Sequence, residues 1–393
     1  MTASVRISVV GAGLIGIRHV EEIVASDCAE LASIVDPGPA GPAVADKFGV
    51  VCHQTLAELF ERDKPDGIIL ATPNQLHVEG ALACIAAGVP VIVEKPLADT
   101  VGGAKRLVEA GESAGVPVLT GHHRNYSPIM ATAKKVVNEG VLGRIVAVTG
   151  TALFYKPDDY FDVGGGWRRE PGGGPILLNL THEVNNLQQL LGRIVRVQAV
   201  ASNAVRGFPV EDTAAMVFTF ANGALGTFLL SDAAGSARSW EQTSRENASY
   251  STYPDEDCYH IAGTAGSLSV PTMRLKVFAG KPSWWEPLET STIEIDRSDP
   301  LANQIVHFAA VISGDAEPIC SARDGLDTMR VVDAVIESAA TGQPVDLAPS
   351  SSVGMPNRDD GSAEDGGGSS RRVSGGGPRT HSSGSGAPVC PTA

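Results

Sequence analysis

Several features are missing from this chain of 393 residues, and each absence excludes a class of protein. No apolar run approaches the roughly 18–20 residues of a membrane-spanning helix. The start of the chain shows no basic segment and no cleavage-like site, so we expect no signal peptide. Basic residues number 30 against 45 acidic ones, and the formal charge of −15 argues against a general binder of nucleic acid or anionic membrane.

Cysteine is also sparse. Six cysteines are scattered along the chain without a Cys-x-x-Cys pair. This usage is typical of reduced thiols, so we expect a cytoplasmic protein. The adjacent His122 and His123 invite a metal site, but no carboxylate or cysteine stands at ligand spacing beside them, so we predict none.

Strand and helix patterns alternate regularly from residue 5 to about 120. Strands are predicted at residues 5–10, 31–35, 67–71, 89–93 and 116–120, and helices at residues 14–25, 56–62, 78–87 and 101–114. This alternation predicts an α/β fold, a doubly wound parallel sheet of the Rossmann type, over residues 1–124.

The pattern then changes to strands joined by turns. After a helix at residues 128–139, we predict strands at 145–154, 195–201, 214–220, 224–230, 266–270 and 275–278, and helices at 181–191, 303–312 and 328–341. Residues 125–347 should therefore form an α+β domain on a mostly antiparallel sheet, whose last helices are free to pack back on the first domain. Residues 348–393 are rich in Ser, Gly, Pro and Arg, which predicts a disordered tail.

A glycine-rich turn between the first strand and the first helix predicts a dinucleotide site. Glycines allow a tight turn and a close approach of the backbone to a pyrophosphate at the helix N-terminus. The expected contacts here are Gly11, Gly13, Leu14, Ile15 and Gly16. Asp36, 20 residues later at the end of the second strand, would accept bonds from ribose hydroxyls and repel a 2′-phosphate, which favours NAD over NADP. The alternative for Asp36 is a plain turn residue.

The next strand ends in Ala71, Thr72, Pro73 and Asn74, whose short polar groups are candidates for contacts with the cofactor. The alternative is a helix cap, since Thr and Asn cap well. His77 follows and is expected to be an ordinary helix residue.

Residues 91–97 read Val-Ile-Val-Glu-Lys-Pro-Leu, a buried strand that ends abruptly in a charge pair and a proline. Ligands of open α/β sheets lie beyond the carboxyl ends of the strands. Glu94 and Lys95 are therefore expected at the cofactor, and the adaptable pKa of a lysine suits proton transfer. The alternative is a solvated Lys95 before a helix that starts at Pro96.

Together these motifs resemble the Gfo/Idh/MocA family of oxidoreductases. The matching runs are Gly11 to Gly16, Ala71-Thr72-Pro73, Glu94-Lys95-Pro96-Leu97, Gly172-Gly173-Gly174 with His182, and residues 337–345, in a similarity that spans about residues 5–347. The resemblance implies a Rossmann domain and a second domain with a large open sheet that mediates assembly into a dimer or tetramer. It also implies a tightly held nicotinamide cofactor and hydride exchange with a hydroxyl carbon of a sugar, cyclitol or related ring.

The resemblance further implies that Lys95 and His182 meet the reacting hydroxyl. Histidine exchanges a proton near neutral pH, and an ammonium stabilises a developing alkoxide. We therefore predict His182 as general base and Lys95 as its electrostatic partner, the alternative for His182 being a structural residue.

The sequence departs from the family beside this histidine. Many members carry an aspartate four residues before it and another three residues after it, where this chain has Leu178 and Asn185. Asn179 and Glu183 are then candidates to orient His182.

Other polar and aromatic residues near strand ends are candidates for substrate binding, each with a solvated loop residue as the alternative. They are Arg124, Tyr126, Lys156, Trp167, Arg168 and Asn179. The sequence thus predicts an NAD-dependent oxidoreductase acting between a secondary hydroxyl or ketone of a sugar, cyclitol or cyclic hydroxy acid and the nicotinamide. The alternatives are a dihydrodiol dehydrogenase, a redox relative that cleaves glycosides with retained NAD, and a non-catalytic NAD-binding regulatory protein.

Overall fold

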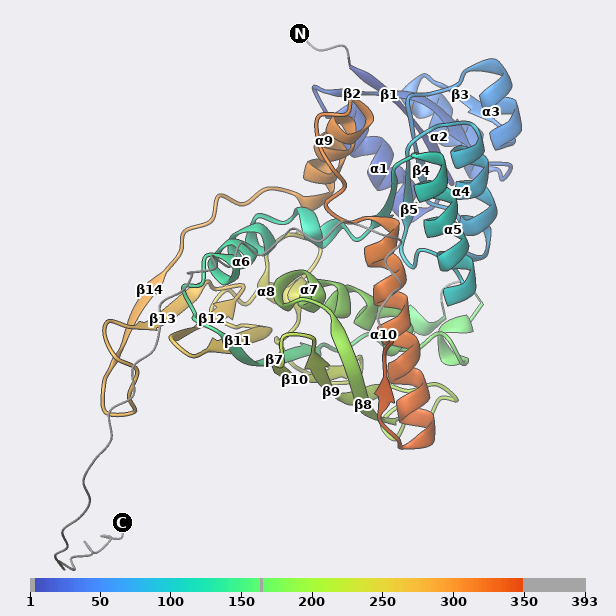
Figure 1. Cartoon of the computed structure of the whole chain (residues 1–393). Helices are drawn as coiled ribbons and strands as arrows, with labels where there is room; N and C mark the ends of the chain where they lie inside the picture. Colours follow the sequence, from blue (N-terminus) through green and yellow to red (C-terminus); the bar gives the residue numbers. More distant parts are fainter. Residues whose placement is uncertain (1–3, 163–164, 349–393) are drawn as a thin grey trace, which may run out of the picture. The chain divides into compact units, whose positions relative to one another are not determined.

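The computed structural model describes residues 4–162 and 165–348. Its N-terminal part is a parallel six-stranded sheet in the order β3-β2-β1-β4-β5-β6 (Figure 1). The strands are β1 (Val5–Val10), β2 (Ala29–Val35), β3 (Val51–His53), β4 (Gly67–Leu70), β5 (Val91–Glu94) and β6 (Val118–Gly121), and the connecting helices are α1 (Leu14–Val24), α2 (Ala40–Phe48), α3 (Leu56–Arg62), α4 (His77–Ala86) and α5 (Val101–Ala114).

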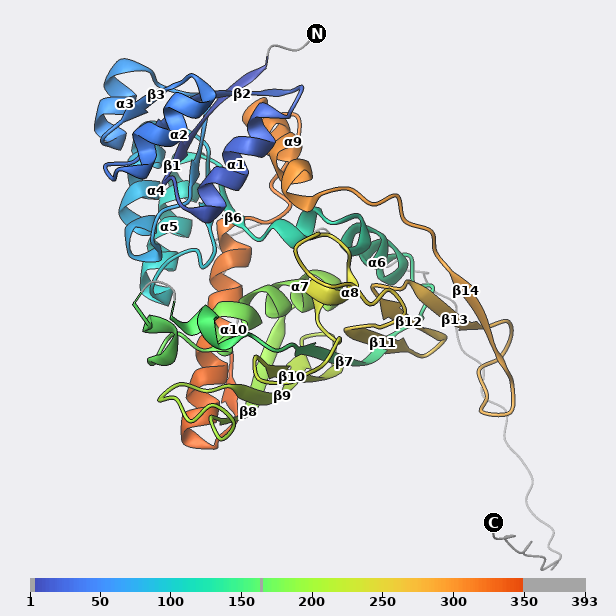
Figure 2. The ribbon, with the colours of Figure 1, turned by 180° about the vertical axis from the view of Figure 1, so that it is seen from behind.

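Both faces of this sheet are covered, as its mostly apolar and buried strands require. Residues of α1, α2 and the later α9 (Pro300–Ile312) pack on one face, and residues of α3, α4 and α5 pack on the other (Figures 1 and 2). The strand order reverses between β1 and β4, and ligands of such sheets bind at this switch point. The predicted motifs that follow β1, β4 and β5 therefore lie at the same edge of the sheet, where the carboxyl ends of these parallel strands meet.

The sequence pattern missed α2 and β3. Pro37, Gly38, Pro39 and Pro42 crowd this stretch and hide the helical signal, and β3 has only three residues. Tertiary pairing of β3 with β2, rather than a local propensity, defines this edge.

The C-terminal part is a nine-stranded sheet in the order β14-β13-β12-β11-β7-β10-β9-β8-β15, in which every pair is antiparallel except the parallel β7 and β10. Its strands are β7 (Ile145–Leu153), β8 (Ile194–Ser202), β9 (Thr213–Phe220), β10 (Leu225–Ser231), β11 (Tyr259–Gly263), β12 (Gly266–Val270), β13 (Arg274–Phe278), β14 (Leu288–Thr292) and β15 (Val345–Asp346), and the helices are α6 (Pro128–Asn138), α7 (Thr181–Leu191), α8 (Trp240–Thr243), α9 and α10 (Ala322–Thr341). The predicted fold class, a Rossmann sheet followed by a mostly antiparallel second sheet, is confirmed.

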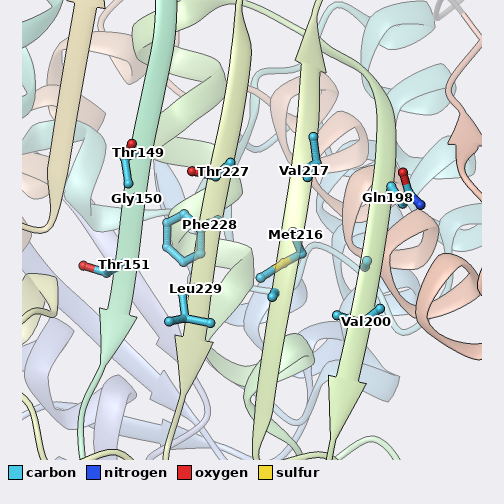
Figure 3. Close-up of a pocket in the computed structure, with 12 residues that line it drawn as sticks. Thr149, Gly150, Thr151, Gln198, Val200, Met216, Val217, Thr227, Phe228 and Leu229 are labelled. Carbon is cyan, nitrogen blue, oxygen red and sulfur yellow. The ribbon is translucent and has the colours of Figure 1, made fainter. Parts of the chain in front are cut away.

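The two faces of the second sheet differ. One face packs against α6, α7 and α10 in a single apolar core. The opposite face of β7, β10, β9 and β8 carries a shallow hollow of about 600 Å³ (Figure 3). Apolar side chains on this face remain exposed, among them Val200 at 65%, Val217 at 46% and Leu229 at 39%. An apolar sheet face without a covering layer is an unusual surface for an isolated chain.

The closing helices connect the two sheets. In α9, Ile305 and Phe308 pack in the core of the first sheet. In α10, Leu326 lies in the core of the first sheet and Val335 in that of the second. A capping box of Ser321 and Asp324 starts α10 at residue 322, six residues before the predicted start at 328, because the polar first turn lacks the apolar spacing on which that prediction depended.

No helix in the described ranges is long and apolar enough to cross a membrane. The predicted disordered tail, residues 348–393, lies outside the described residues except for Ala348.

Candidate active site

The turn between β1 and α1 has the geometry of a phosphate-binding loop. Gly11 adopts φ +101°, and a Cβ there would lie 2.6 Å from the carbonyl oxygen of Ala71. A Cβ on Gly16 would lie 1.9 Å from the carbonyl oxygen of Gly11, so the helix can pack only with glycine there. Gly13, by contrast, faces open space, with no atom within 4 Å of an added Cβ, and Leu14 beside it is 90% exposed. Close packing beneath the turn and open space above it fit an approaching pyrophosphate.

Asp36 lies directly after β2, beside this turn. Its carboxylate accepts the backbone N–H of Ala12 at 2.7 Å and that of Gly38 at 2.7 Å. The residue therefore acts as a turn residue that also holds the glycine turn at Ala12. Each carboxylate oxygen retains a lone pair, so these bonds leave capacity for ribose hydroxyls.

The segment after β4 forms the next part of this edge. Ala71 is buried against Gly11, and Asn74 begins a short 3₁₀ turn. The hydroxyl of Thr72 is buried and has no hydrogen-bond partner among the described residues, while Pro73 is exposed. An unpartnered hydroxyl beside the glycine turn is a group that a bound cofactor would satisfy.

Lys95 follows β5, and its peptide bond to Pro96 is cis. Glu94 is buried and accepts a bond from His19 of α1 at 2.8 Å and one from the backbone N–H of Lys95 at 3.1 Å. Burial lowers the pKa of the Lys95 ammonium, although the charge of Glu94 acts in the opposite direction. Within the described ranges, this ammonium makes no hydrogen bond and no ion pair, so it remains available for a ligand.

Three histidine rings meet near Lys95, whose positive charge adds to burial in lowering the pKa of each of them. His182, on the first turn of α7, lies with its ring centroid 5.7 Å from that of His122 and 5.5 Å from that of His123. Burial, and then the positive charge of Lys95, lower the pKa of His182 well below its usual value. Burial likewise lowers the pKa of His122 to about 3 and that of His123 to about 4. The three rings are therefore neutral at pH 7, and His182 can accept a proton.

The departures from the family pattern have structural consequences. Leu178 occupies a π-helical segment, Ile176–Leu180, just before α7, and Asn185 bonds to Asn125 at 2.6 Å. Neither Asn179 nor Glu183 bonds to His182. In the residues that the structure describes, the Nδ1 atom of His182 is buried without a hydrogen-bond partner. Packing, rather than a carboxylate, holds this ring.

Arg124 is buried between two carboxylates. Its guanidinium donates to Glu183 at 2.7 Å and to Glu241, and lies 5.5 Å from the ring of Trp240. Although burial acts to lower it, the two carboxylates raise the pKa of Arg124. Tyr126 points elsewhere, toward His307 of α9 with ring centroids 5.3 Å apart. Of the two residues, only Arg124 borders the cavity described below.

Lys156, Trp167 and Arg168 belong to a cluster of cationic and aromatic side chains on the second domain. Lys156 donates to Asn179 at 2.8 Å and lies 3.5 Å from Asp232. The guanidinium of Arg168 lies 4.6 Å from the ring of Tyr160 and 4.8 Å from that of Trp167. Trp167 is 44% exposed, which leaves part of its ring available for contact with a ligand.

Residues of both domains line a cavity of about 570 Å³ at this site. Ile15 and Arg18 line it from α1, His182 from α7, and Trp240 and Glu241 from α8. Residues 244–250 line the cavity as well. The volume is in the range of small-molecule sites. Sequence reasoning missed Trp240, Glu241 and residues 244–250, because they carry no motif and reach the site only through the fold.

No group of three or more His, Cys, Asp and Glu side chains arranged to hold a metal ion occurs in residues 4–162 and 165–348.

The fold and this site define a class of protein, and two family models match it. Residues 5–122 match the Gfo/Idh/MocA model described as "Oxidoreductase family, NAD-binding Rossmann fold", and residues 134–347 match that family's "C-terminal alpha/beta domain". The chain belongs to the Gfo/Idh/MocA family, and it is an oxidoreductase of the dehydrogenase class. The resemblance predicted from the motifs is confirmed.

Individual relatives differ in substrate and cofactor. The chain is 27% identical to a 1,5-anhydro-D-fructose reductase of Ensifer adhaerens, over 78% of this chain and 87% of that protein. It is 25% identical to a D-xylose 1-dehydrogenase (NADP(+)) of Haloferax volcanii, over 86% and 98%. Its fold is similar to the WlbA dehydrogenase of Bordetella pertussis in complex with NADH and UDP-GlcNAcA, with a TM-score of 0.70, 25% identity, and 88% and 100% of the chains covered.

Proposed function

We propose that this protein is an NAD-dependent dehydrogenase that acts between a secondary hydroxyl and the corresponding ketone of a neutral sugar or cyclitol. The observation that carries the proposal is the ammonium of Lys95, which follows β5 at the carboxyl edge of the Rossmann sheet and makes no hydrogen bond or ion pair in the described ranges. This ammonium lies near enough to His182 for its charge to add to burial in lowering the pKa of that ring. When bound, the nicotinamide supplies the group that exchanges hydride with the hydroxyl carbon.

The residues around the glycine turn would hold the cofactor. The open space at Gly13, the exposed Leu14 and the unpartnered hydroxyl of Thr72 fit a dinucleotide. Asp36 supports NAD over NADP, because a carboxylate at this position repels a 2′-phosphate. Relatives of both kinds exist, so the two cofactors must be compared directly.

The reacting hydroxyl would lie between Lys95 and His182. His182 accepts the hydroxyl proton as general base, because its neutral ring has a free nitrogen lone pair. Lys95 donates a hydrogen bond to the same oxygen and stabilises the negative charge that develops as the proton leaves. In ketone reduction the same two groups return the proton.

The charge balance of the site supports a neutral substrate. Arg124 is paired with two carboxylates, Glu183 and Glu241. Lys156 and Arg206 share Asp232, and Arg206 also lies 3.6 Å from Asp158. Four carboxylates thus face these three cations, which leaves little free positive potential on them for an acid. Glu241, which lines the cavity, suits donated bonds from sugar hydroxyls. A cyclic hydroxy acid is the competing substrate class.

Two broader proposals accompany this one. The five cysteines of the described residues are free thiols, which supports work in a reducing compartment such as the cytoplasm. The open apolar face of the second sheet supports assembly into a homo-oligomer, since a second copy would cover it.

The test is a substrate screen with NAD⁺ and NADP⁺ side by side. The names of relatives suggest an inositol and D-xylose for oxidation and 1,5-anhydro-D-fructose for reduction. D-glucuronate and L-tartrate are included as acidic compounds. We expect a change in nicotinamide absorbance with a neutral polyol and NAD⁺, and its loss in Lys95→Ala and His182→Ala with NADH binding retained. Faster turnover of the acids than of the neutral compounds would contradict the proposal that the substrate is a neutral sugar or cyclitol.

One observation favours a second candidate. Leu178 replaces the family aspartate, and His182 lacks an orienting partner among the described residues. A protein that binds NADH tightly and turns over none of these compounds would be a non-catalytic NAD-dependent regulator.

A further inference from the structure

His77 links two loops at the edge of the Rossmann sheet. It opens α4, is only 1% exposed, and lies between the carboxyl ends of the adjacent strands β4 and β5. Its Nε2 atom lies 2.9 Å from the carbonyl oxygen of Thr72, and its Nδ1 atom lies 2.9 Å from the carbonyl oxygen of Pro96. One side chain therefore bridges the Thr72 segment and the segment that carries Lys95.

Both of these partners can only accept hydrogen bonds. A neutral imidazole has one N–H and one lone pair, so it satisfies one carbonyl and directs its lone pair at the other. Both carbonyl contacts at 2.9 Å are therefore hydrogen bonds only if each ring nitrogen carries a hydrogen. Among the residues that the structure describes, these two backbone carbonyls are the hydrogen-bond partners of the ring.

We propose that His77 is a positioning residue, an imidazolium that fixes the backbone at Thr72 and Pro96 and thereby places Lys95. Only the assignment of Lys95 and Thr72 to the cofactor site rests on the proposed function. The ammonium of Lys95 makes no hydrogen bond in the described ranges, so its position depends on its backbone. That backbone is held on one side by Glu94, which is tied to His19 of α1, and on the other by His77 of α4.

The first test measures the protonation of the ring directly. Protein labelled with ¹⁵N-histidine is studied by NMR at pH 7 without cofactor, and the His77 signals are assigned by their absence in His77→Gln. We expect both ring nitrogens of His77 to carry a hydrogen. A single protonated nitrogen overturns the proposal, whatever the enzyme does. If His77→Gln folds poorly, His77→Asn provides the assignment of the wild-type signals.

The second test measures the consequence for the cofactor site. Glutamine can donate to one of the two carbonyls but directs its own oxygen at the other, so His77→Gln should bind NADH at least about 10-fold more weakly. The matched control is His260→Gln, an exposed histidine of β11 whose Nδ1 lies 3.2 Å from the hydroxyl of Ser269, and it should bind NADH like the wild type.

Unchanged NADH affinity in a folded His77→Gln overturns the positioning role. If instead no polyol is turned over by the wild type, the proposed function fails while the NMR spectrum and the NADH titration still decide on His77.

Discussion

At the scale of single residues, the site depends on charges that are paired in different ways. Glu94 uses one carboxylate oxygen on His19 and the other on the backbone of Lys95, so neither holds the lysine ammonium. Arg124, in contrast, is fully engaged by Glu183 and Glu241. The first arrangement leaves the ammonium of Lys95 free to bind a ligand, whereas the second holds the guanidinium of Arg124 in place.

The pH dependence of turnover should report the Lys95 ammonium. Because burial lowers its pKa, the ammonium is lost at a lower pH than in free lysine, and oxidation should fall on the alkaline side below the usual range of lysine. On the acid side the profile should stay level through about pH 6.5, because the pKa of His182 lies well below its usual value. Lys95→Arg, which keeps its charge, should lose the alkaline fall in a kcat/KM profile. The same fall in both proteins would exclude Lys95 as its source.

Removal of Arg124 should destabilise the fold. Arg124→Met leaves the buried Glu183 without its cation, which should lower the free energy of unfolding by about 3–5 kcal/mol. The control is Arg196→Met, which breaks an exposed pair with Asp346 and should cost less than about 1 kcal/mol. Urea unfolding measures both, and equal losses would argue against a special role for the buried pair.

At the scale of elements, the turn from β1 to α1 separates folding from binding within a few residues. Gly11 and Gly16 are required because neighbouring backbone fills the space where a Cβ would lie. Gly13 is the N-cap of α1, where glycine is favoured, and an added Cβ would meet nothing in the protein, so the space beside it is open to a ligand.

Two alanine substitutions test this division. Gly11→Ala should lower the free energy of unfolding by about 1–3 kcal/mol, because φ +101° and the nearby Ala71 carbonyl disfavour a side chain. Gly13→Ala replaces a favoured N-cap residue and should lower the free energy of unfolding by about 1 kcal/mol or less, yet it should weaken NADH binding about 10-fold or more. Thermal unfolding and NADH titration of both variants give the answer. Normal NADH binding by Gly13→Ala would contradict the cofactor position.

At the scale of the whole molecule, α10 joins the cores of both sheets while one face of the second sheet stays open (Figures 1 and 3). The centre of this face carries threonines and aliphatic side chains rather than charges. Such a surface is typical of an interface between copies of one chain.

A lysine in the centre of this face should disrupt self-association. We expect the wild type to sediment as a dimer or tetramer and Val217→Lys to sediment as a smaller species, because the interface would bury an unpaired charge. Val205→Lys, at a residue that is 69% exposed outside the hollow, is the matched control and should behave like the wild type. A monomeric wild-type protein would contradict the proposed assembly.

The sequence alone determined the Rossmann sheet, the glycine turn and the position of Lys95, because these depend on local signals: apolar strand runs, glycine spacing and an abrupt strand end. It also named His182 through its resemblance to the family. Tertiary structure alone decided that Arg124 is held by two carboxylates, that Tyr126 faces α9, and that Trp240 and Glu241 line the cavity. These contacts join residues that lie far apart in the chain, and no local pattern records them. His77 shows the same limit, since the two carbonyls that its ring contacts meet only when β4 and β5 pair in the sheet.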